Sequence, residues 1–412
     1  MLINKMSMGL LAALASSTVF AAGYSTTQLS RQPLNNESPL INAQRDVVWS
    51  AATPTGRKIF LYESVESAVR QLNNDNAVYG NYQINVHGDV VWVSFVGTQQ
   101  EVFLYTARTE AVTQISSGNY NPYDNGPQLS NNGDVVWTQG SNVAVIRYNA
   151  ATKTAAPLVF PGATLQAYPR INGRGDIAWL ATVGGHSQIL RFLAADKSIA
   201  DISNPNLDAY GNQQIDDRGD IVWNGSDGTD SEMYRYDGVT RKVTQLTNDT
   251  YDEDQFKQGA SGDITWVAYL PDGTNVITLY RAATGQISVI ANEPRFVVPK
   301  INARGDVAWT SIIGTTYSSN LYVASTNKIV QLTNTQNQGV FELVLADNGD
   351  AAWSFYDGSD YEVFTYQAAT GAKTQLTKNT VDDGIISMNA EGSLAWTQFN
   401  PTNSQIMRAV FK

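Results

Sequence analysis

INARGDVAWTS, residues 301–311, contains an element that recurs along the whole chain. The copies are INAQRDVVW (41–49), INVHGDVVW (84–92), LSNNGDVVW (129–137), INGRGDIAW (171–179), IDDRGDIVW (215–223), GASGDITW (259–266), INARGDVAW (301–309), LADNGDAAW (345–353) and MNAEGSLAW (388–396). Each of the nine tryptophans ends one copy, and successive tryptophans are separated by 42 to 45 residues. A fixed period of this length indicates a repeat architecture.

Each repeat contains four short strand-like segments. In the repeat that contains Trp223, these segments are residues 212–216, 220–225, 232–238 and 242–247. Such β-branched and aromatic runs, separated by Gly, Asn and Asp, are typical of antiparallel strands in meander order. Four strands in a unit of about 43 residues predict a β-propeller blade. Leucine-rich and helical repeats do not fit, because their shorter period or 3.6-residue periodicity does not occur.

The two ends of the sequence predict how the propeller closes. The last repeat has a third strand at 405–412 but no fourth strand after it. Residues 24–30, YSTTQLS, match the fourth strands of other repeats, such as VTQLT (243–247) and KTQLT (373–377). We therefore expect an all-β fold, a single closed β-propeller of nine four-stranded blades whose last blade is completed by the N-terminal strand. A linear solenoid would leave an exposed edge, a smaller ring would leave whole repeats outside, and two rings would each need a closing strand.

The tripeptide Arg-Gly-Asp occurs at 174–176, 218–220 and 304–306. It is the tripeptide that integrin-type receptors read, so an adhesion signal is one interpretation. In the other repeats the Arg position varies while Gly and Asp recur, which favours a turn. Gly permits a positive φ, and Asp can accept hydrogen bonds from turn amides. The sequence therefore predicts a turn motif in which Arg is a solvated residue at a variable position.

Composition and charge exclude several classes of function. The net charge is −11 and no basic run occurs, which argues against nucleic-acid binding. The chain has no cysteine, so no disulfide can form. Residues 1–22 combine a lysine, a short apolar run and small residues, which predicts a secretory signal peptide followed by a propeller domain over 23–412. No membrane span is expected, and the location is periplasmic or secreted.

Two stretches carry a resemblance to a known family. RYDGVTRKVTQLTNDTYDED (235–254) and TYQAATGAKTQLTKNTVDD (365–383) resemble the repeats of periplasmic TolB-type and other bacterial WD-like propellers. The aromatic third strand and the Gln-Leu-Thr fourth strand match, whereas the following turn is Asn-x-x-Gly-Asp instead of Pro-x-x-Ser-Pro-Asp-Gly. The resemblance implies scaffolding and protein or ligand binding outside the cytoplasm, while some related propellers are lyases or flank peptidase domains. TolB's separate N-terminal domain has no counterpart in this sequence.

The sequence offers few groups for catalysis. His87 and His186 are the only histidines, and neither lies in a catalytic motif. No nucleophile elbow, zinc-binding helix or phosphate loop occurs, so we expect no catalytic residue and no cofactor. The loops DGTDSE (227–232) and DGSDYE (357–362) offer carboxylates to a calcium ion, but their spacing is not that of an EF-hand and Asp-Gly also suits a plain turn. We therefore expect no metal.

The loops between a fourth strand and the next first strand are the predicted binding surface. They are rich in Tyr, Asn and Asp, which suits sugars or polar peptides, although loops are commonly polar in any case. The predicted ligand-binding residues are Tyr120, Tyr123, Asp124, Asp208, Tyr210, Tyr251, Asp252 and Asp254. We expect a non-enzymatic scaffold that binds a protein or a polar ligand, such as a carbohydrate, on one face. The alternative is a propeller enzyme, such as a polysaccharide lyase, with ionisable residues concentrated on one side of the channel.

Overall fold

The computed structural model describes residues 11–12, 20–21, 23–118, 126–140, 144–295, 297–336 and 339–411. These residues form β-strands joined by short turns, and their only helix is the 3-10 turn η1 (Ala107–Thr109). No helix in these ranges is long and apolar enough to cross a membrane. The all-β class predicted from the repeats is therefore confirmed.

The repeats form meanders of four antiparallel strands, and three of these sheets gain a further short strand. The first three sheets are β4 (Asn35–Ile41), β5 (Val47–Thr53), β6 (Gly56–Glu63) and β7 (Ala68–Gln71); β8 (Ala77–Ile84), β9 (Val90–Val96), β10 (Gln99–Thr106) and β11 (Ala111–Gln114); and β12 (Gln128–Leu129), β13 (Val135–Gln139), β14 (Ala144–Asn149) and β15 (Thr154–Pro157).

The next three sheets are β16 (Thr164–Ile171), β17 (Ile177–Val183), β18 (His186–Phe192) and β19 (Ile199–Asp201); β20 (Gln214–Ile215), β21 (Ile221–Ser226), β22 (Ser231–Tyr236) and β23 (Val243–Gln245); and β24 (Asp252–Gln258), β25 (Ile264–Tyr269), β26 (Asn275–Arg281) and β27 (Gln286–Glu293). The strand predicted over 212–216 is thus reduced to the two residues of β20, since Asn212 has a left-handed conformation (φ 55°) and the ladder with β21 includes only Gln214 and Ile215.

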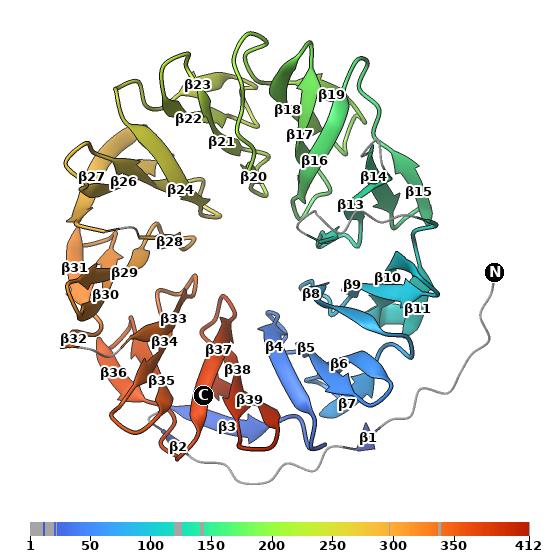
Figure 1. Ribbon diagram of the computed structural model, residues 1–412, viewed down its shortest axis with the longest axis vertical. Coiled ribbons are helices and arrows are strands. Elements are labelled where there is room, and N and C mark those ends of the chain that lie inside the picture. The colour runs from blue at the N-terminus through green and yellow to red at the C-terminus, as the bar shows by residue number, and fades with distance from the viewer. Residues whose placement is uncertain are drawn as a thin grey trace.

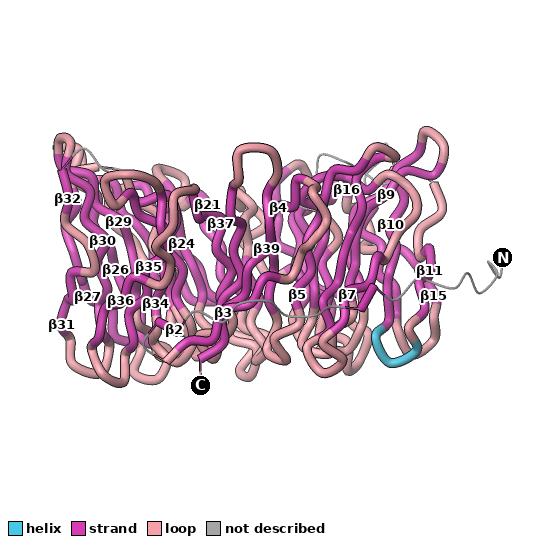
Figure 2. The backbone as a smooth tube through the Cα atoms, turned by 90° about the horizontal axis from the view of Figure 1, so that it is seen from below, coloured by secondary structure: helices cyan, strands magenta, loops and turns pink. Residues whose placement is uncertain are grey.

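The remaining sheets are β28 (Lys300–Ile301), β29 (Val307–Ile313), β30 (Thr316–Val323) and β31 (Lys328–Gln331), with the extra strand β32 (Thr335–Gln336) on β30; β33 (Val340–Leu345), β34 (Ala351–Tyr356), β35 (Tyr361–Gln367) and β36 (Ala372–Gln375); and β37 (Asp382–Met388), β38 (Leu394–Phe399), β39 (Ser404–Phe411) and β3 (Tyr24–Gln28). Two short strands, β1 (Leu11–Ala12) and β2 (Phe20–Ala21), pair with β7 and β3. Figure 1 shows the sheets following one another around a central axis, and Figure 2 shows the turns on two opposite faces.

The tryptophans form the core between neighbouring sheets, as predicted. All nine are at most 2% exposed. Trp92 of β9, for example, packs in one cluster with Val48, Ile59 and Leu61 of the preceding sheet. A buried Trp contributes about 200 Å² of contact area. Each sheet is therefore held to the next mainly by apolar packing.

The predicted pairing of the N-terminal strand is confirmed. β3 runs antiparallel to β39, with Tyr24 opposite Phe411 and Gln28 opposite Met407. The first and last sheets also adjoin, because the Asn389 side-chain amide donates to the carbonyl oxygen of Asn42 at 2.9 Å. Between β39 and β4 the described ladder consists of one parallel pair of residues, Ser404 with Asn35.

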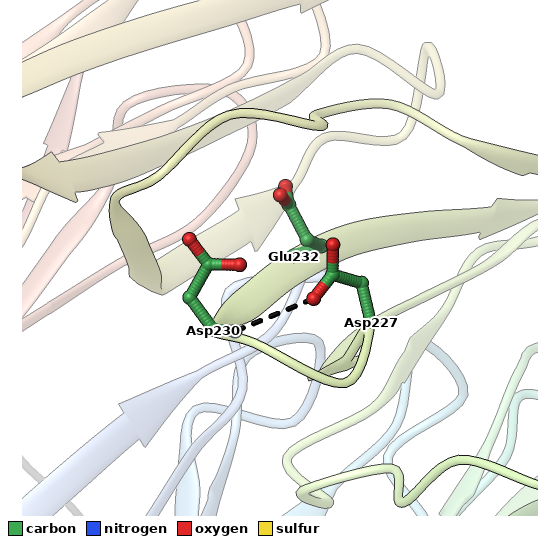
Figure 3. A group of neighbouring side chains, drawn as sticks. All are labelled: Asp227, Asp230 and Glu232. Carbon is green, nitrogen blue, oxygen red and sulfur yellow. Dashed lines mark hydrogen bonds between the residues drawn. The ribbon is translucent and has the colours of Figure 1, made fainter.

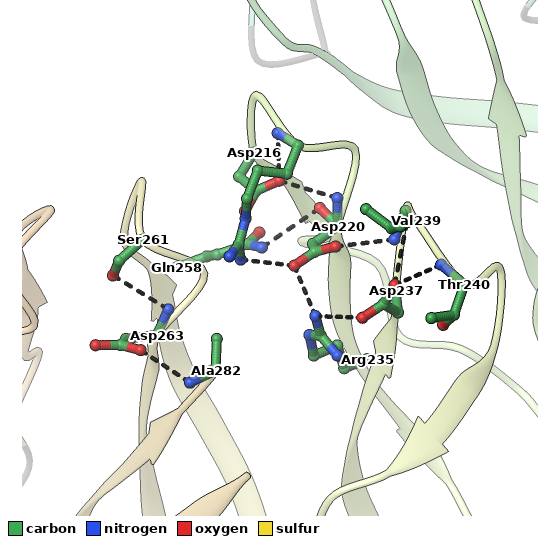
Figure 4. Close-up of polar contacts among 12 residues, drawn as sticks. Asp216, Asp220, Arg235, Asp237, Val239, Thr240, Gln258, Ser261, Asp263 and Ala282 are labelled. Atoms are coloured by element: carbon green, nitrogen blue, oxygen red, sulfur yellow. Dashed lines mark hydrogen bonds and ion pairs between the residues drawn. The ribbon is translucent and has the colours of Figure 1, made fainter. Parts of the chain in front are cut away.

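The aspartate of the recurrent turn has a structural role. In eight repeats one carboxylate oxygen accepts a hydrogen bond, at 2.8–2.9 Å, from the backbone N–H 16 to 19 residues later, at the turn between the third and fourth strands. Figure 4 shows this bond from Ala282 to Asp263, and the ion pair of Asp220 with Arg235 at 2.7 Å. The glycine of the motif has a positive φ in eight repeats, as predicted, whereas the aspartate accepts from the backbone of the turn between the third and fourth strands and, within the described residues, not from the backbone of its own turn.

The arginines of Arg-Gly-Asp are exposed, as predicted, but they also contact neighbouring turn residues. Arg218 pairs with Asp216 and Asp220, and Arg304 donates to the carbonyl oxygen of Asn348 in the next repeat. The three arginine side chains keep 41–55% of their surface exposed. The sequence did not reveal the contact of Arg304, because the partner turn of the next repeat is 44 residues away.

Candidate functional site

In each sheet the strand nearest the central axis leaves one edge exposed, here called the inner edge. Polar side chains lie along this edge. These inner strands are the first strand of each sheet, from β4 to β37 (Figure 1). Unpaired edge N–H groups need acceptors. In several repeats the side chain nine places before the tryptophan, here called position −9, supplies one. Gln83 accepts from Leu129 N at 2.9 Å, Gln214 from Gln258 N at 3.0 Å, and Ser387 from Ile41 N at 3.2 Å.

Three repeats carry a cation at position −9, where no acceptor is available. These residues are Arg170, Lys257 and Lys300. Burial, followed by the charge of Arg170, lowers the pKa of Lys257. Burial also lowers the pKa of Lys300, with a further contribution from Lys257, while Glu342 opposes the shift. Among the described residues neither lysine ammonium has a hydrogen-bond or ion-pair partner. The inner edge therefore carries an arc of three cationic residues, with the carboxyl groups of Asp254 and Glu342 nearby, in a chain of net charge −11.

A groove of about 330 Å³ lies at one end of this arc. Its charged residues are Lys300 of β28 and Glu342 of β33, and its other walls come from β4, β33 and β37. One oxygen of Glu342 accepts from Ile386 N at 2.6 Å. Burial raises the pKa of Glu342. Groups whose pKa is shifted in a concave site are the usual candidates for binding or chemistry.

Backbone strain marks the same edge. The residue eleven places before the tryptophan has a left-handed conformation in five repeats, with φ between 51° and 55°: Ser38, Tyr168, Asn212, Gln255 and Ile385. For β-branched Ile385 this conformation is costly. The ladders shift register beside several of these residues, as at a β-bulge. Ser38 and Ile385 line the groove, so part of its shape depends on strained backbone.

The predicted binding residues of the loops lie in several places. Tyr120, Tyr123 and Asp124 lie outside the described residues. Asp208 accepts from Ser187 N at 2.7 Å, and Asp252 accepts from Ser231 N at 3.0 Å, each 21 residues earlier. These two carboxylates therefore hold the start of a third strand, a role that their sequence did not reveal.

The aromatic residues of the predicted surface are more accessible. Tyr210 is half exposed, and Tyr251 is intermediate between buried and exposed. Asp254 accepts from the neighbouring Gln255 side chain at 3.1 Å. Asp208 and Tyr210 lie in the connection between β19 and β20, whereas Asp252 and Asp254 lie on β24 and not in a loop as predicted.

A second pocket adjoins Asp208. It has a volume of about 190 Å³ and is lined by Asp208, Trp223, Tyr234 and Gln245 among others. Burial and the nearby carboxylates of Asp227 and Glu232 raise the pKa of Tyr234 to about 12. The pocket therefore combines an aromatic surface with carboxylate and amide groups, which suits a polar ligand.

The two acidic loops also form compact groups, as Figure 3 shows for Asp227, Asp230 and Glu232. The second group is Asp357, Asp360 and Glu362. Each acidic group lies beside one further buried carboxyl group, which is Glu253 for the first group and Asp383 for the second. Burial is the main reason that the pKa of Glu253 rises to about 9 and that of Asp383 to about 7.

The sequence-based prediction missed the inner-edge residues Arg170, Lys257, Lys300 and Glu342. A usable signal existed at position −9, which reads Leu40, Gln83, Gln128, Arg170, Gln214, Lys257, Lys300, Val344 and Ser387. Cations occur there in three repeats among residues that are otherwise neutral. The sequence does not show that these cations lie close together, because this depends on the arrangement of the inner strands around a common axis.

Comparisons with known proteins support the type of fold. Neither protein-family models nor curated protein sequences match the chain. Among solved structures, dipeptidyl peptidase 4 from Porphyromonas gingivalis has 13% identity and a TM-score of 0.53 over 93% of this chain and 58% of that one. Oligogalacturonate lyase from Vibrio parahaemolyticus has 9% identity and a TM-score of 0.49 over 99% and 100%. TolB from Acinetobacter baumannii has 13% identity and a TM-score of 0.35 over 68% and 77%.

At these identities the comparisons show the propeller-type fold alone. The chain spans little more than half the length of the peptidase. The peptidase is an enzyme, but a likeness at 13% identity does not carry its activity over to this chain. The resemblance to propeller proteins in general is supported, whereas membership of the TolB type itself is not.

Proposed function

We propose that this protein is a periplasmic or secreted, non-enzymatic propeller that binds a polar ligand carrying a negative charge at its inner edge. In this proposal residues 1–22 are a signal peptide, and residues 23–412 form a closed ring of nine blades. The pairing of β3 with β39 and the bond from Asn389 to Asn42 support the ring. The observation that carries the function is the arc of Arg170, Lys257 and Lys300, of which the two lysines have no partner among the described residues.

The chemistry of the arc defines the ligand class. Three cations close together repel one another, and an anionic group placed between them would relieve that repulsion. The groove beside Lys300 adds an apolar wall and the carboxyl group of Glu342, which can accept a hydrogen bond from a hydroxyl or amide group. A small carboxylate- or phosphate-bearing ligand with further polar groups fits these features. The overall charge of −11 would slow the approach of such an anion, so binding depends on the local field of the arc.

The test is a binding measurement with defined anions. Calorimetric titrations of galacturonate, glucose 6-phosphate and neutral galactose are expected to give binding for at least one anion and none for galactose. Lys257→Met and Lys300→Met should each weaken this binding at least tenfold, whereas Lys242→Met, at an exposed turn residue, should leave it unchanged. Binding that is equal in all three variants would contradict the proposal.

The predicted binding surface between fourth and first strands, here called the loop face, is a second candidate surface on which this propeller would bind a partner. Its predicted residues are Tyr120, Tyr123, Asp124, Asp208, Tyr210, Tyr251, Asp252 and Asp254. The pocket beside Asp208 supports this choice, because it places Trp223 and Tyr234 next to polar groups. A neutral, hydroxyl-rich ligand suits this face better than an anion, since Asp227 and Asp230 are near Tyr234.

A specific observation also favours the alternative, a propeller enzyme such as a polysaccharide lyase. Ionisable residues are concentrated on one side of the inner edge, and Lys300 and Glu342 have pKa shifts toward their neutral forms. In such an elimination a neutral lysine accepts the proton from the carbon next to a uronate carboxylate, a C=C bond forms as the glycosidic C–O bond breaks, and the departing oxygen takes a proton from a carboxyl group such as that of Glu342. Incubation with polygalacturonate should then yield unsaturated products that absorb in the ultraviolet, and Lys300→Met should abolish them. Without such products from any acidic polysaccharide, the non-enzymatic proposal is preferred.

A further inference from the structure

The two acidic loops occupy equivalent places in two sheets. In the first group, Asp227 and Asp230 lie in the loop between β21 and β22, and Glu232 lies on β22. In the second group, Asp357 and Asp360 lie in the loop between β34 and β35, and Glu362 lies on β35. Glu232 is paired in the ladder with the second residue after Trp223, and Glu362 with the second residue after Trp353. In each group, one carboxylate oxygen from each residue lies within 4.8 Å of the others. Figure 3 shows the group of Asp227, Asp230 and Glu232.

The turn accounts for both aspartates of each group, because the hydroxyl groups of Thr229 and Ser359 donate to Asp230 and Asp360 at 2.9 and 2.6 Å. Asp227 accepts from Thr229 N at 2.8 Å, and Asp357 from Ser359 N at 3.0 Å. The loop between β25 and β26 makes the same turn, since Asp272 accepts from Thr274 N at 2.9 Å. There, however, the ladder position of Glu232 and Glu362 is taken by Val276. The glutamates are therefore not required to form the turn.

The glutamates are buried with an oxygen that has no partner. Glu232 and Glu362 are both 0% exposed. One oxygen of Glu232 accepts from Asp249 N at 2.9 Å, and one of Glu362 accepts from Asn379 N at 2.6 Å. The other oxygen of each glutamate, and one oxygen of Asp360, have no hydrogen-bond donor among the described residues. Burial of an uncompensated carboxylate is costly, so these oxygens point to a missing positive group.

Other repeats show how the same ladder position is normally satisfied. In the first sheet it holds Lys58, whose ammonium group donates to the carbonyl oxygens of Thr55, Asn74 and Asp75. In the second sheet it holds Glu101, whose two oxygens accept from Ser116 Oγ and Gly118 N. A cation thus fits this place in the fold, and a buried glutamate can be fully satisfied there. Glu232 and Glu362 have no cation there, and their further side-chain contacts are with Thr247 and Glu253 and with Thr377 and Asp383.

We propose that each of the two groups, Asp227–Asp230–Glu232 and Asp357–Asp360–Glu362, binds a hard divalent cation of the Ca²⁺ type. All the donor atoms are oxygens, which Ca²⁺ prefers. The two groups contain none of the nitrogen or sulfur ligands that are typical of zinc sites. Calcium–oxygen distances are about 2.3–2.6 Å, so ligand oxygens on opposite sides of the ion lie about 5 Å apart. The observed limit of 4.8 Å is compatible with that arrangement. No ion pair joins these six residues to a lysine, arginine or histidine within the described part of the chain.

The ions would connect neighbouring sheets as well as strands of one sheet. Glu232 binds the backbone of Asp249, in the connection to β24, and Glu362 binds the backbone of Asn379, in the connection to β37. Buried Glu253 of β24 and Asp383 of β37 lie next to these glutamates. Each ion would therefore stabilise the packing of a sheet against its successor. This role does not depend on what binds at the inner edge.

The test uses the full chain after removal of metal with a chelator. Titration with CaCl2, followed by calorimetry, is expected to show two sites, and the melting temperature should rise with calcium by mass action. Glu232→Gln and Glu362→Gln should each leave one site, and the double variant none. Asp272→Asn and Glu101→Gln are matched controls that should keep both sites. Magnesium at the same concentration should bind at least tenfold more weakly, because it prefers a stricter octahedral geometry.

A measurement without calcium separates ion binding from a purely structural role. In metal-free solution Glu232→Gln and Glu362→Gln should melt at the same or a higher temperature than the unaltered chain, because a neutral amide replaces an uncompensated carboxylate. If both variants melt lower and calcium still binds with two sites, the glutamates are structural and the proposal fails. The absence of any calcium binding by the unaltered chain at millimolar concentration would also overturn it.

Discussion

The hydroxyl group of Tyr24 donates a hydrogen bond to the backbone carbonyl oxygen of Gly392, 368 residues later, at 3.3 Å. Tyr24 is almost fully buried and packs with Trp396 and Val363. This contact fixes β3 against the last repeat in the same cluster that joins the sheets of β35 and β38. The closing strand is therefore part of the core.

Deletion of residues 24–30 should lower the stability of the protein. It removes the ladder between β3 and β39 and exposes an edge that can pair with another molecule. We expect a lower melting temperature in calorimetry and larger species in size-exclusion chromatography. Tyr24→Phe, which removes only the hydroxyl group, should remain monomeric and lose about 1 kcal/mol. A deletion variant that stays monomeric with an unchanged melting temperature would show that β3 does not stabilise the closure.

The Arg-Gly-Asp turns should not act as adhesion signals. Asp176, Asp220 and Asp306 are at most 5% exposed, so a receptor cannot reach their carboxylates without disrupting the turns. We expect no cell adhesion that a soluble Arg-Gly-Asp peptide can inhibit. Specific, peptide-inhibited attachment of cells to the folded protein would contradict this expectation.

Within the same turn the aspartate should matter more than the arginine. Asp306→Ala removes a buried acceptor of Ala324 N and should cost about 1–3 kcal/mol in urea unfolding. Arg304→Asn loses a half-exposed ion pair with Asp306 and should cost about 1 kcal/mol or less. The reverse order would mean that the contact of Arg304 with the next repeat dominates.

The lysines of the inner edge should make stability depend on pH. Their pKa is lowered in the folded state, so the unfolded chain binds more protons between the folded pKa and the ordinary value near 10.4. The free energy of unfolding should therefore gain a positive contribution as pH rises through that window. The double variant Lys257→Met and Lys300→Met should lose this contribution, which urea unfolding between pH 7 and 10 can measure. An equal slope for both proteins would contradict the assigned direction.

Residues of the loop face should separate into structural and accessible groups. Asp208→Ala and Asp252→Ala should each lower the free energy of unfolding by about 1 kcal/mol, because each removes the acceptor of a backbone N–H. Tyr210→Ala should leave it unchanged, because this side chain is half exposed. If the loop face binds a partner, capture of that partner should fall with Tyr210→Ala and Tyr251→Ala. Melting curves recorded in parallel distinguish lost binding from lost folding.

The fold was readable from the sequence because its decisive features repeat at a constant period. The spacing of Trp49, Trp92 and the later tryptophans identifies the sheets, and the match of residues 24–30 to other fourth strands identifies the pairing with β39. The site was not readable in the same way. Gln83 and Lys257 occupy the same position in their repeats, but only the arrangement of inner strands shows that one satisfies a neighbouring N–H and the other cannot.

Asp208 shows the opposite limit. A polar loop residue next to Tyr210 has the composition of a binding site, yet its carboxylate is used by Ser187 N. Loop sequences do not indicate which backbone N–H groups lack a partner, because that depends on where the neighbouring strand ends. The acidic groups at Glu232 and Glu362 were visible as motifs, whereas their burial and unpartnered oxygens were not.

The sheet shared by β3 and β39 has a consequence for biosynthesis. β3 leaves the ribosome early, but its partner follows only after almost all of the remaining residues have been made. Until then the early strand has no neighbour on that side, and bringing the two segments together carries the entropic cost of a very long loop. Earlier sheets can form from contiguous sequence, whereas this one must form last. A chain that is cut short during translation would keep an exposed edge, so cellular chaperones and proteases could distinguish incomplete molecules from finished ones.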